Sequence, residues 1–342
     1  MTQRFRERGG GTMKIRKLII GATIGLLLAT PSLTSRVARV AAQTKTTATV
    51  QETDDKVKVD LYTKFVENYK TNEAAAHHAG KDYLARYAKD NDQYSKYIQL
   101  WVDRYEKGER QKTLWKLVHT DRNFSEAFPV GKVVMAEEPD QLDSLIALGT
   151  AGYLAAGARN NNFDKEAIAY ARRAIQLIEG GKAPVSWDPY KGKEDTLAYL
   201  YLTLGILQLK TAPNEAIDAL LKSVQHESEL KKQPSTYLYL AQAYQSGPYA
   251  KLSADFQAKF GGKPETTESK AALEKLDQVI DVMIDAYARA VALAGTDPQY
   301  AQNKTAWLNA LTPFYKFRHQ DTDAGLNEFI AGVISKPLPA KP

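Results

Sequence analysis

The chain has 342 residues, 44% of them hydrophobic and 25% charged, which is typical of a globular protein with a large core. It contains no cysteine, and this excludes disulfide bonds, a thiol nucleophile, a thiolate metal site and a lipidated cysteine near the amino terminus. The formal net charge is +6, but residues 1–42 hold eight basic residues against one acidic residue, so the remainder has a net charge of −1. Capture of a phosphate backbone needs clustered positive charge, and we therefore expect no nucleic-acid partner.

Residues 1–42 have the composition of an export sequence. Basic residues precede the apolar run Leu18–Ala29, which is shorter than the about 20 residues of a membrane-spanning helix, and Val40, Ala41 and Ala42 follow it. This pattern predicts a signal peptide cleaved after Ala42, or alternatively an uncleaved amino-terminal anchor in the inner membrane. In both cases we expect the body to be exported to the periplasm or the cell exterior. Residues 43–56 are polar and predict a flexible tether.

From Val57 onward the apolar residues have helical spacing, and no segment alternates with a period of two. The stripes are Leu61, Phe65, Val66 and Tyr69; Ala76, Gly80, Tyr83, Leu84 and Tyr87; Tyr94, Tyr97, Ile98, Trp101 and Tyr105; and Leu114, Trp115 and Val118. We expect Tyr97, Trp101 and Tyr105 to be core residues, and Gly108 either to break or to bend the helix. The sequence predicts an all-α fold.

A helical hairpin over residues 142–180 is the clearest unit. In its first arm Leu145, Leu148, Gly149 and Tyr153 share one face, and in its second arm Ala167, Ala171 and Ala174 do the same. Small residues at these spacings predict close helix contact. Because one hairpin cannot bury its apolar face alone, similar hairpins are expected on either side.

Two pairs of positions, Leu114 with Leu148 and Trp115 with Gly149, show a period of 34 residues. This is the period of the tetratricopeptide repeat, whose pattern is W-x2-L-G-x2-Y, then A-x3-F, then P. The matches are Tyr237, Leu240, Ala241 and Tyr244 to the first half of the pattern, and Tyr201, Leu204 and Gly205 followed by Ala216, Leu220 and Ser223 to both halves. The chain resembles the tetratricopeptide-repeat family over residues 57–335, most clearly over 108–245.

The resemblance implies a right-handed α-solenoid of tetratricopeptide-like hairpins, with capping helices at residues 300–319 and 323–334. Two inserted loops, at residues 182–195 and 246–269, depart from the pattern. In the second loop Phe256 and Phe260 are expected to dock a short helix onto the stack. Residues 336–342 predict a disordered tail.

No catalytic or phosphate-binding motif is present, and no spacing of histidines and carboxylates is that of a metal site. Ser228 and Lys231 have S-x-x-K spacing but lack the partner motifs of an acyl-enzyme site. We therefore expect no catalytic residue, no metal and no cofactor.

In the tetratricopeptide family, ligands commonly bind the concave surface formed by the first helix of each hairpin. Carrying the repeat register across gives as candidates Lys112, Lys116, His119, Asp143, Ile146, Tyr153, Tyr199, Gln242 and Gln245. Lys112 and Lys116 are placed to hold an anion, although the asparagines of the family's carboxylate clamp have no counterpart here. The alternative is that these charged residues form a solvated helix face.

Trp187 and Tyr190 are further candidates because they lie in the irregular loop at 182–195. Exposed loop aromatics often anchor a partner, but a loop tryptophan also often fixes the loop to its scaffold. Both alternatives remain open at this point.

These observations favour an exported, non-catalytic scaffold or adaptor that binds a protein or peptide through its groove and loops. The alternative is a helical enzyme acting on cell-envelope polymers, with carboxylates brought together from distant helices. A cleft with two carboxyl groups, one of them with a raised pKa, would favour the enzyme.

Overall fold

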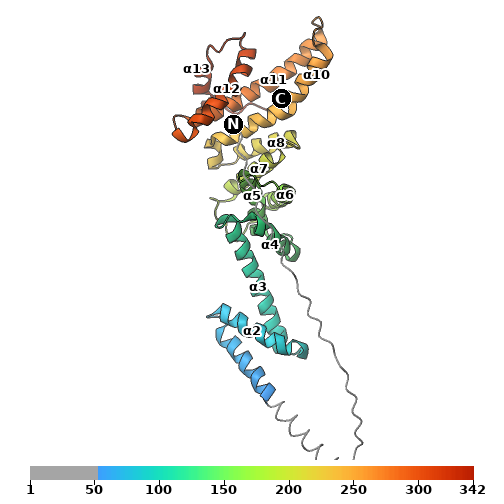
Figure 1. Ribbon diagram of the computed structural model, residues 1–342, viewed down its shortest axis with the longest axis vertical. Coiled ribbons are helices and arrows are strands. Elements are labelled where there is room, and N and C mark those ends of the chain that lie inside the picture. Colours follow the sequence, from blue (N-terminus) through green and yellow to red (C-terminus); the bar gives the residue numbers. More distant parts are fainter. Residues whose placement is uncertain (1–52) are drawn as a thin grey trace, which may run out of the picture. The chain divides into compact units, whose positions relative to one another are not determined.

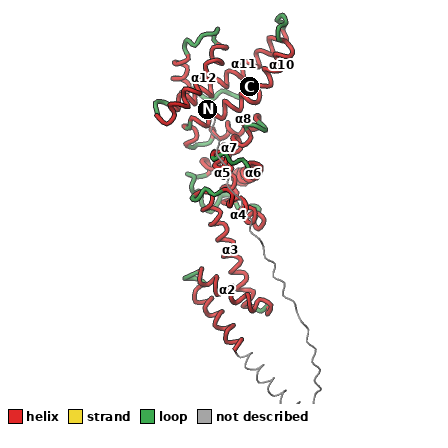
Figure 2. The backbone as a smooth tube through the Cα atoms, in the orientation of Figure 1, coloured by secondary structure: helices red, strands yellow, loops and turns green. Residues whose placement is uncertain are grey.

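The computed structural model describes residues 53–342, so the expected leader and most of the expected tether lie outside the described residues. The chain divides between Ser95 and Lys96 into two compact units. Throughout 53–342 the regular elements are helices and no strand occurs (Figures 1 and 2). The all-α expectation is confirmed. Within that same range, no helix is both long and apolar enough to span a membrane.

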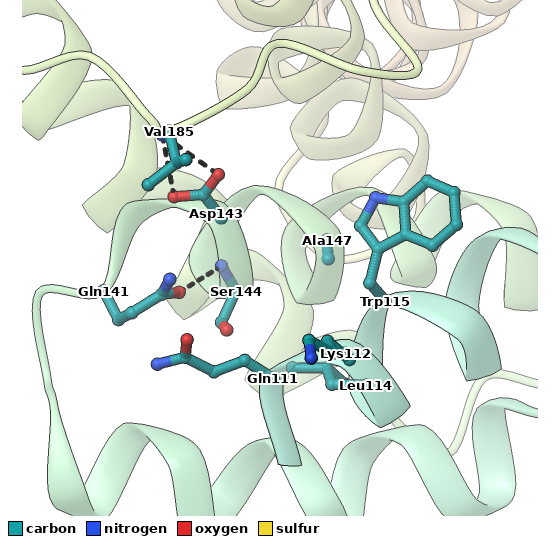
Figure 3. A pocket seen from close by; sticks show the side chains of 9 residues that line it. All are labelled: Gln111, Lys112, Leu114, Trp115, Gln141, Asp143, Ser144, Ala147 and Val185. Atoms are coloured by element: carbon teal, nitrogen blue, oxygen red, sulfur yellow. Dashed lines mark hydrogen bonds between the residues drawn. The ribbon is translucent and has the colours of Figure 1, made fainter. Parts of the chain in front are cut away.

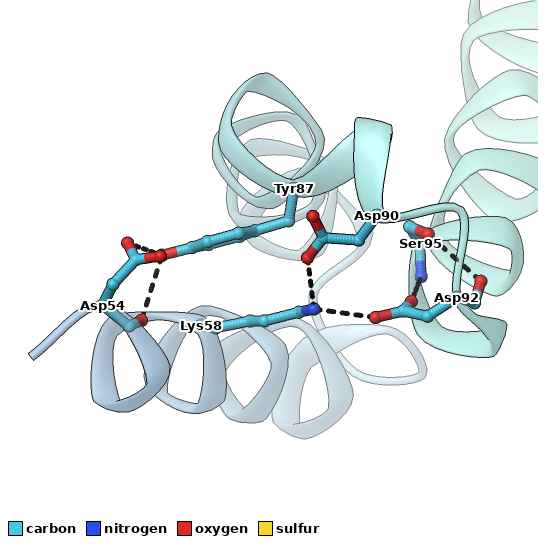
Figure 4. Close-up of polar contacts among 6 residues, drawn as sticks. All are labelled: Asp54, Lys58, Tyr87, Asp90, Asp92 and Ser95. Carbon is cyan, nitrogen blue, oxygen red and sulfur yellow. Dashed lines mark hydrogen bonds and ion pairs between the residues drawn. The ribbon is translucent and has the colours of Figure 1, made fainter. Parts of the chain in front are cut away.

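The described part of the first unit contains a helix over 53–68, α2 (Glu73–Tyr87), the 3₁₀ turn η1 (Ala88–Asp90) and the start of α3. Residues 53–56 are helical, although the sequence predicts that they end a flexible tether. The Tyr87 hydroxyl donates to the backbone carbonyl of Asp54 at 3.1 Å and to its Oδ1 at 2.8 Å (Figure 4). This contact fixes the beginning of the helix against α2.

Lys58 links the first helix to the connection between α2 and α3. Its Nζ donates to Asp90 Oδ2 at 2.5 Å and to Asp92 Oδ2 at 2.7 Å, while Asp92 Oδ1 accepts from the Ser95 backbone N–H at 2.8 Å (Figure 4). The Lys58 ammonium, followed by the Ser95 amide, lowers the pKa of Asp92 to about 2. The same two aspartates raise the pKa of Lys58.

We predict that Lys58→Met weakens the first unit and flattens its response to acid. Because the folded-state pKa of Asp92 is depressed, its contribution is present above the ordinary value of 3.8 and is lost as the pH falls towards about 2. Solvent screening limits the effect to about 1 kcal/mol or less. Hydrogen exchange of the amides in 53–95 should be faster in Lys58→Met at pH 5, and the difference should shrink at pH 2. Lys64→Met, an exposed control on the same helix, should exchange like the wild type.

The second unit, Lys96–Pro342, holds most of α3 and the remaining helices. Their bounds are α3 (Gln93–His119), α4 (Phe124–Glu137), α5 (Leu142–Gly157), α6 (Asp164–Glu179), α7 (Lys193–Gln208), α8 (Pro213–Gln225), η2 (Glu229–Lys232), α9 (Pro234–Tyr244), η3 (Gln245–Tyr249), α10 (Ala250–Phe260), α11 (Thr267–Ala294), η4 (Pro298–Tyr300), α12 (Ala301–Arg318), α13 (Leu326–Gly332) and η5 (Val333–Ser335). The expected capping helices coincide with α12 and with α13 together with η5.

Helices of the second unit pack mainly against neighbours in the sequence (Figure 1). The pairs α5 with α6, α7 with α8 and α9 with α11 are in contact. In addition, α5 contacts α7, and α7 contacts α9. A row of α5, α7 and α9 thus runs through the unit.

Glycines of α5 allow α6 and α7 to approach closely. A Cβ atom added at Gly152 would lie 2.3 Å from the Ala167 Cβ of α6 and 2.9 Å from Leu207 Cδ1 of α7. One added at Gly149 would lie 3.0 Å from the Ala171 Cα. Ala167 and Ala171 are fully buried, so the predicted contact of small residues in the 142–180 hairpin is confirmed.

In α3 the structure corrects the predicted core face. The helix runs unbroken through Gly108. Its buried side chains in this stretch include Ile98 and Val102, whereas Tyr97 is 45% exposed and Trp115 is 43% exposed. The expected core positions Trp101 and Tyr105 are only half-buried. The aromatic residues flank the buried aliphatic residues and repeat with the same helical spacing. The sequence pattern therefore did not distinguish the aromatic face of the helix from its buried face.

The second inserted segment, at residues 246–269, was expected to be a loop but is largely helical. The chain continues from α9 through the π-helical turn η3 into α10 without leaving helical geometry, although Gly247 and Pro248 lie in that turn. Phe256 and Phe260 of α10 are half-buried and line a cavity against α11, in agreement with the expected docking. In α11 the Thr266 and Ser269 side chains each accept a backbone N–H of the other residue, which defines its start.

The Gly152 contact makes a specific prediction for stability. Gly152→Ala must push α5 away from the fixed Ala167 Cβ and should destabilise the second unit by about 1–3 kcal/mol. The control is Gly157→Ala in the same helix, where nothing lies within 4 Å of the added atom and a gain of about 0.5 kcal/mol is expected. Urea unfolding followed by circular dichroism measures both. Equal midpoints for the two variants would contradict the close approach.

Candidate functional site

Two adjoining pockets lie along α5 in the second unit. The first, called here the Trp115 pocket, has a volume of about 240 Å³ and is lined by Gln111, Lys112, Leu114, Trp115, Gln141, Asp143, Ser144, Ala147 and Val185 (Figure 3). The second, the tyrosine pocket, has a volume of about 370 Å³ and is lined by His119, Arg122, Thr150, Tyr153, Leu154, Pro189, Tyr190, Lys191, Asp195, Tyr199 and Glu229.

α5 supplies both pockets from one face. Asp143 and Ala147 line the first, and Thr150 and Leu154 continue the same helical spacing into the second. The end of α3 also connects them, because the Trp115 ring packs on the His119 ring with centroids 5.1 Å apart. Both pockets thus lie along α5 and are lined by residues of α3 or its end and of the loop at 182–195, and the pair is called here the recess.

Asp143 holds that loop over α5. Its carboxylate accepts the backbone N–H of Val185 through both oxygens at 3.1 Å (Figure 3). It also accepts the backbone N–H of Ser186 at 3.3 Å. Gln141 caps the same helix, since its Oε1 accepts from the Ser144 N–H at 2.6 Å. Because the charged Asp143 carboxylate accepts hydrogen bonds from two backbone amides of the loop, it holds this irregular segment in a defined position.

Three tyrosines from three elements form the wall of the tyrosine pocket. Tyr153 comes from α5, Tyr190 from the loop and Tyr199 from α7, and the rings of Tyr190 and Tyr199 have centroids 5.3 Å apart. Burial raises the pKa of both Tyr190 and Tyr199, and the Thr150 side chain is a hydrogen-bond partner of the Tyr190 hydroxyl. Tyr239 of α9 packs against the same core cluster as Tyr153 and Tyr199, and burial, followed by Tyr153, raises its pKa.

The charges in the tyrosine pocket are mostly paired. Lys191 Nζ lies 3.3 Å from Glu229 Oε1, and this lysine lowers the pKa of Glu229. Asp195 is buried and accepts the Lys191 backbone N–H at 3.0 Å. Burial lowers the pKa of His119, which favours its neutral form. Arg122 differs, since within residues 53–342 no carboxylate pairs with its guanidinium.

Six of the predicted site residues line the two pockets. Lys112 and Asp143 line the Trp115 pocket, and His119, Tyr153, Tyr190 and Tyr199 line the tyrosine pocket.

The other predicted site residues lie elsewhere. Lys116 pairs with Asp121 at 2.5 Å, and Gln245 accepts from the Tyr287 hydroxyl at 2.7 Å. Gln242 is exposed, and Ile146 is buried in the core. Lys112 also pairs with Glu109 at 2.7 Å, so each of the two lysines proposed to hold an anion has an acidic partner in this structure, and Lys112 alone of the two lines a pocket.

The two loop aromatics differ in position. Trp187 is half-buried and packs on a core cluster that includes Leu142 and Leu197, so it fixes the loop to the scaffold. Tyr190 packs on the same cluster but also lines the tyrosine pocket.

Arg122 and Thr150 belong to the site but were not predicted. Arg122 lies just after α3 with a φ of 52°, in a turn whose geometry the repeat pattern does not specify. Thr150 could have been found from the sequence, since it follows Asp143 by seven residues, two helical turns along α5. Over residues 53–342, no group of three His, Cys, Asp or Glu side chains is placed to hold a metal ion.

Comparisons with protein-family models, with curated protein sequences and with solved structures give no match to this chain. The tetratricopeptide resemblance therefore stays a prediction, and the all-α fold is what the structure shows.

We predict that Asp143→Ala releases the loop. The amides of Val185 and Ser186 should exchange with solvent about tenfold faster, because each loses a charged acceptor. Asp188→Ala is the matched control, since the Asp188 carboxylate accepts from the Ser186 hydroxyl within the loop, whereas the Asp143 carboxylate holds the loop to α5. Unchanged exchange at Val185 in Asp143→Ala would contradict the anchoring role.

Proposed function

We propose that the chain is a non-catalytic scaffold of tetratricopeptide-like hairpins, arranged as a right-handed solenoid, that binds an extended peptide segment of a partner protein in the recess formed by the Trp115 and tyrosine pockets. The observation that carries the proposal is the lining of the tyrosine pocket by α3, α5 and α7. Residues chosen from the repeat register alone, His119, Tyr153 and Tyr199, lie there together. The order of contacts among α5, α7 and α9 supports the solenoid.

The chemistry of the recess suits a peptide. Tyrosine walls provide a large contact area with hydroxyl donors, and an exposed Trp115 offers a second aromatic anchor nearby. Arg122 provides a cation whose charge is not neutralised by a described neighbour. We infer that the bound segment places a carboxylate against Arg122 and an apolar side chain between Tyr153 and Tyr199.

The carboxylates of the tyrosine pocket favour binding over hydrolysis. A glycosidase-like site needs one carboxylic acid with a raised pKa beside a second, ionised carboxylate. Here Lys191 lowers the pKa of Glu229, and Asp195 is engaged in holding the loop backbone. The proposal also includes export of the body to the periplasm or the cell exterior, for which the composition of residues 1–42 is the support.

The test is selection of phage-displayed random peptides on the immobilised full chain, followed by titration of the enriched peptides in solution. Arg122→Ala should bind them about tenfold more weakly, because a charge-assisted hydrogen bond is lost. Arg159→Ala is the control, since Arg159 is also exposed, has a φ of 60° and follows a helix, but lies outside both pockets. Failure to enrich any peptide, or equal binding by the two variants, would contradict the proposal.

A further inference from the structure

The last seven residues, Lys336–Pro342, lie against the second unit in place of the disordered tail that the sequence predicts. Their sequence is KPLPAKP, and Lys336 has φ −93° and ψ 148°, close to polyproline II geometry. Prolines restrict the chain to this extended form and have no N–H, so the segment is rich in carbonyl groups that need external donors.

Arg289 of α11 supplies such donors. Its Nη2 donates to the carbonyl oxygens of Lys336 and Pro337, each at 2.9 Å, and its Nε pairs with Asp285 Oδ1 at 2.6 Å. The Arg289 side chain is only 5% exposed, so its position is fixed by the surrounding protein rather than by solvent. With the tail in place, this guanidinium is held by Asp285 and donates to two consecutive backbone carbonyls of an extended segment.

Two side chains of the tail face the same surface. Leu338 packs on a cluster formed by Val224, Tyr237 and Ala290, and Lys341 pairs with Asp218 of α8. These tail residues are three apart, which is one turn of a polyproline II helix. The remaining tail side chains are exposed. Recognition by alternate anchors on one face is how grooves bind such segments.

The groove is wider than the tail that lies in it. A cavity of about 830 Å³ is bounded by α8, Tyr237 and Arg289 on one side and by Leu338–Lys341 on the other. The tail therefore lines this cavity and is held at its anchors, Arg289 for its backbone and the core cluster for Leu338.

We propose that this surface, called here the tail groove, is a second binding site that recognises extended proline-containing segments with a leucine and a lysine three residues apart, and that the chain's own tail occupies it until a segment of this kind from another protein replaces it. The site is separate from the recess along α5 and does not depend on the function proposed for that recess.

The test uses a fluorescent peptide with the sequence of residues 335–342 and two forms of the protein, the full chain and a chain ending at Ser335. The shortened chain should bind the peptide saturably, with a Kd below about 0.1 mM. The full chain should bind at least about tenfold more weakly, because its tethered tail competes at an effective concentration in the millimolar range. Saturable binding of equal strength by both forms would overturn the proposal, as would no binding by a shortened chain of unchanged helicity.

Full-length variants provide the same test if the shortened chain does not fold. Full-length Leu338→Asp, which keeps the tail but removes its apolar anchor, should bind the peptide as the shortened chain does. The same background with Asp218→Ala should bind several-fold more weakly, whereas Asp255→Ala, a control on α10, should have no effect. A peptide with Leu338→Ala and Ala340→Leu keeps the composition but breaks the spacing, and its binding with unchanged affinity would refute the proposed mode of recognition.

Discussion

The second unit depends on how closely α5 approaches its two neighbours. Gly149 and Gly152 leave no room for a side chain, so the backbone of α5 lies against Ala167 and Ala171 of α6 and against leucines of α7. Dispersion contacts at such short range are individually weak, but they add along the length of three helices. Because α7 packs close to α5, Tyr199 of α7 lines the same pocket as Tyr153 of α5. The packing of small residues in the core thus determines the distance across the functional surface.

Much of the fold could be predicted from the sequence because the relevant rules are local. Periodicity gave the helices, and the spacing of Ala167, Ala171 and Ala174 identified the face of contact. The aromatic face of α3 was misassigned, since Tyr97 and Trp115 lie one position from the buried residues Ile98 and Leu114, and a rotation of about 100° changes exposure completely. Gly247 and Pro248 were interpreted as a loop, although a π-helical turn accommodates them.

The candidate site residues that lie on helices could be predicted from the sequence, whereas those that lie in turns could not. His119, Tyr153 and Tyr199 follow from helical register, whereas the place of Arg122 depends on a left-handed residue after α3. The two lysines expected to bind an anion instead pair with acidic residues a few positions away in sequence. Sequence spacing shows which residues share a face, but competition between nearby charges decides which of them remain available to a ligand.

The four tryptophans, Trp101, Trp115, Trp187 and Trp307, all lie in the second unit. Trp115 lines one pocket, Trp187 fixes the loop over α5, and Trp307 packs against the cluster that receives Leu338. The first unit has tyrosine but no tryptophan. Light absorbed near 295 nm, where tryptophan alone absorbs, therefore excites only the second unit. Tryptophan fluorescence can therefore report on both proposed binding surfaces, and the first unit does not contribute to it.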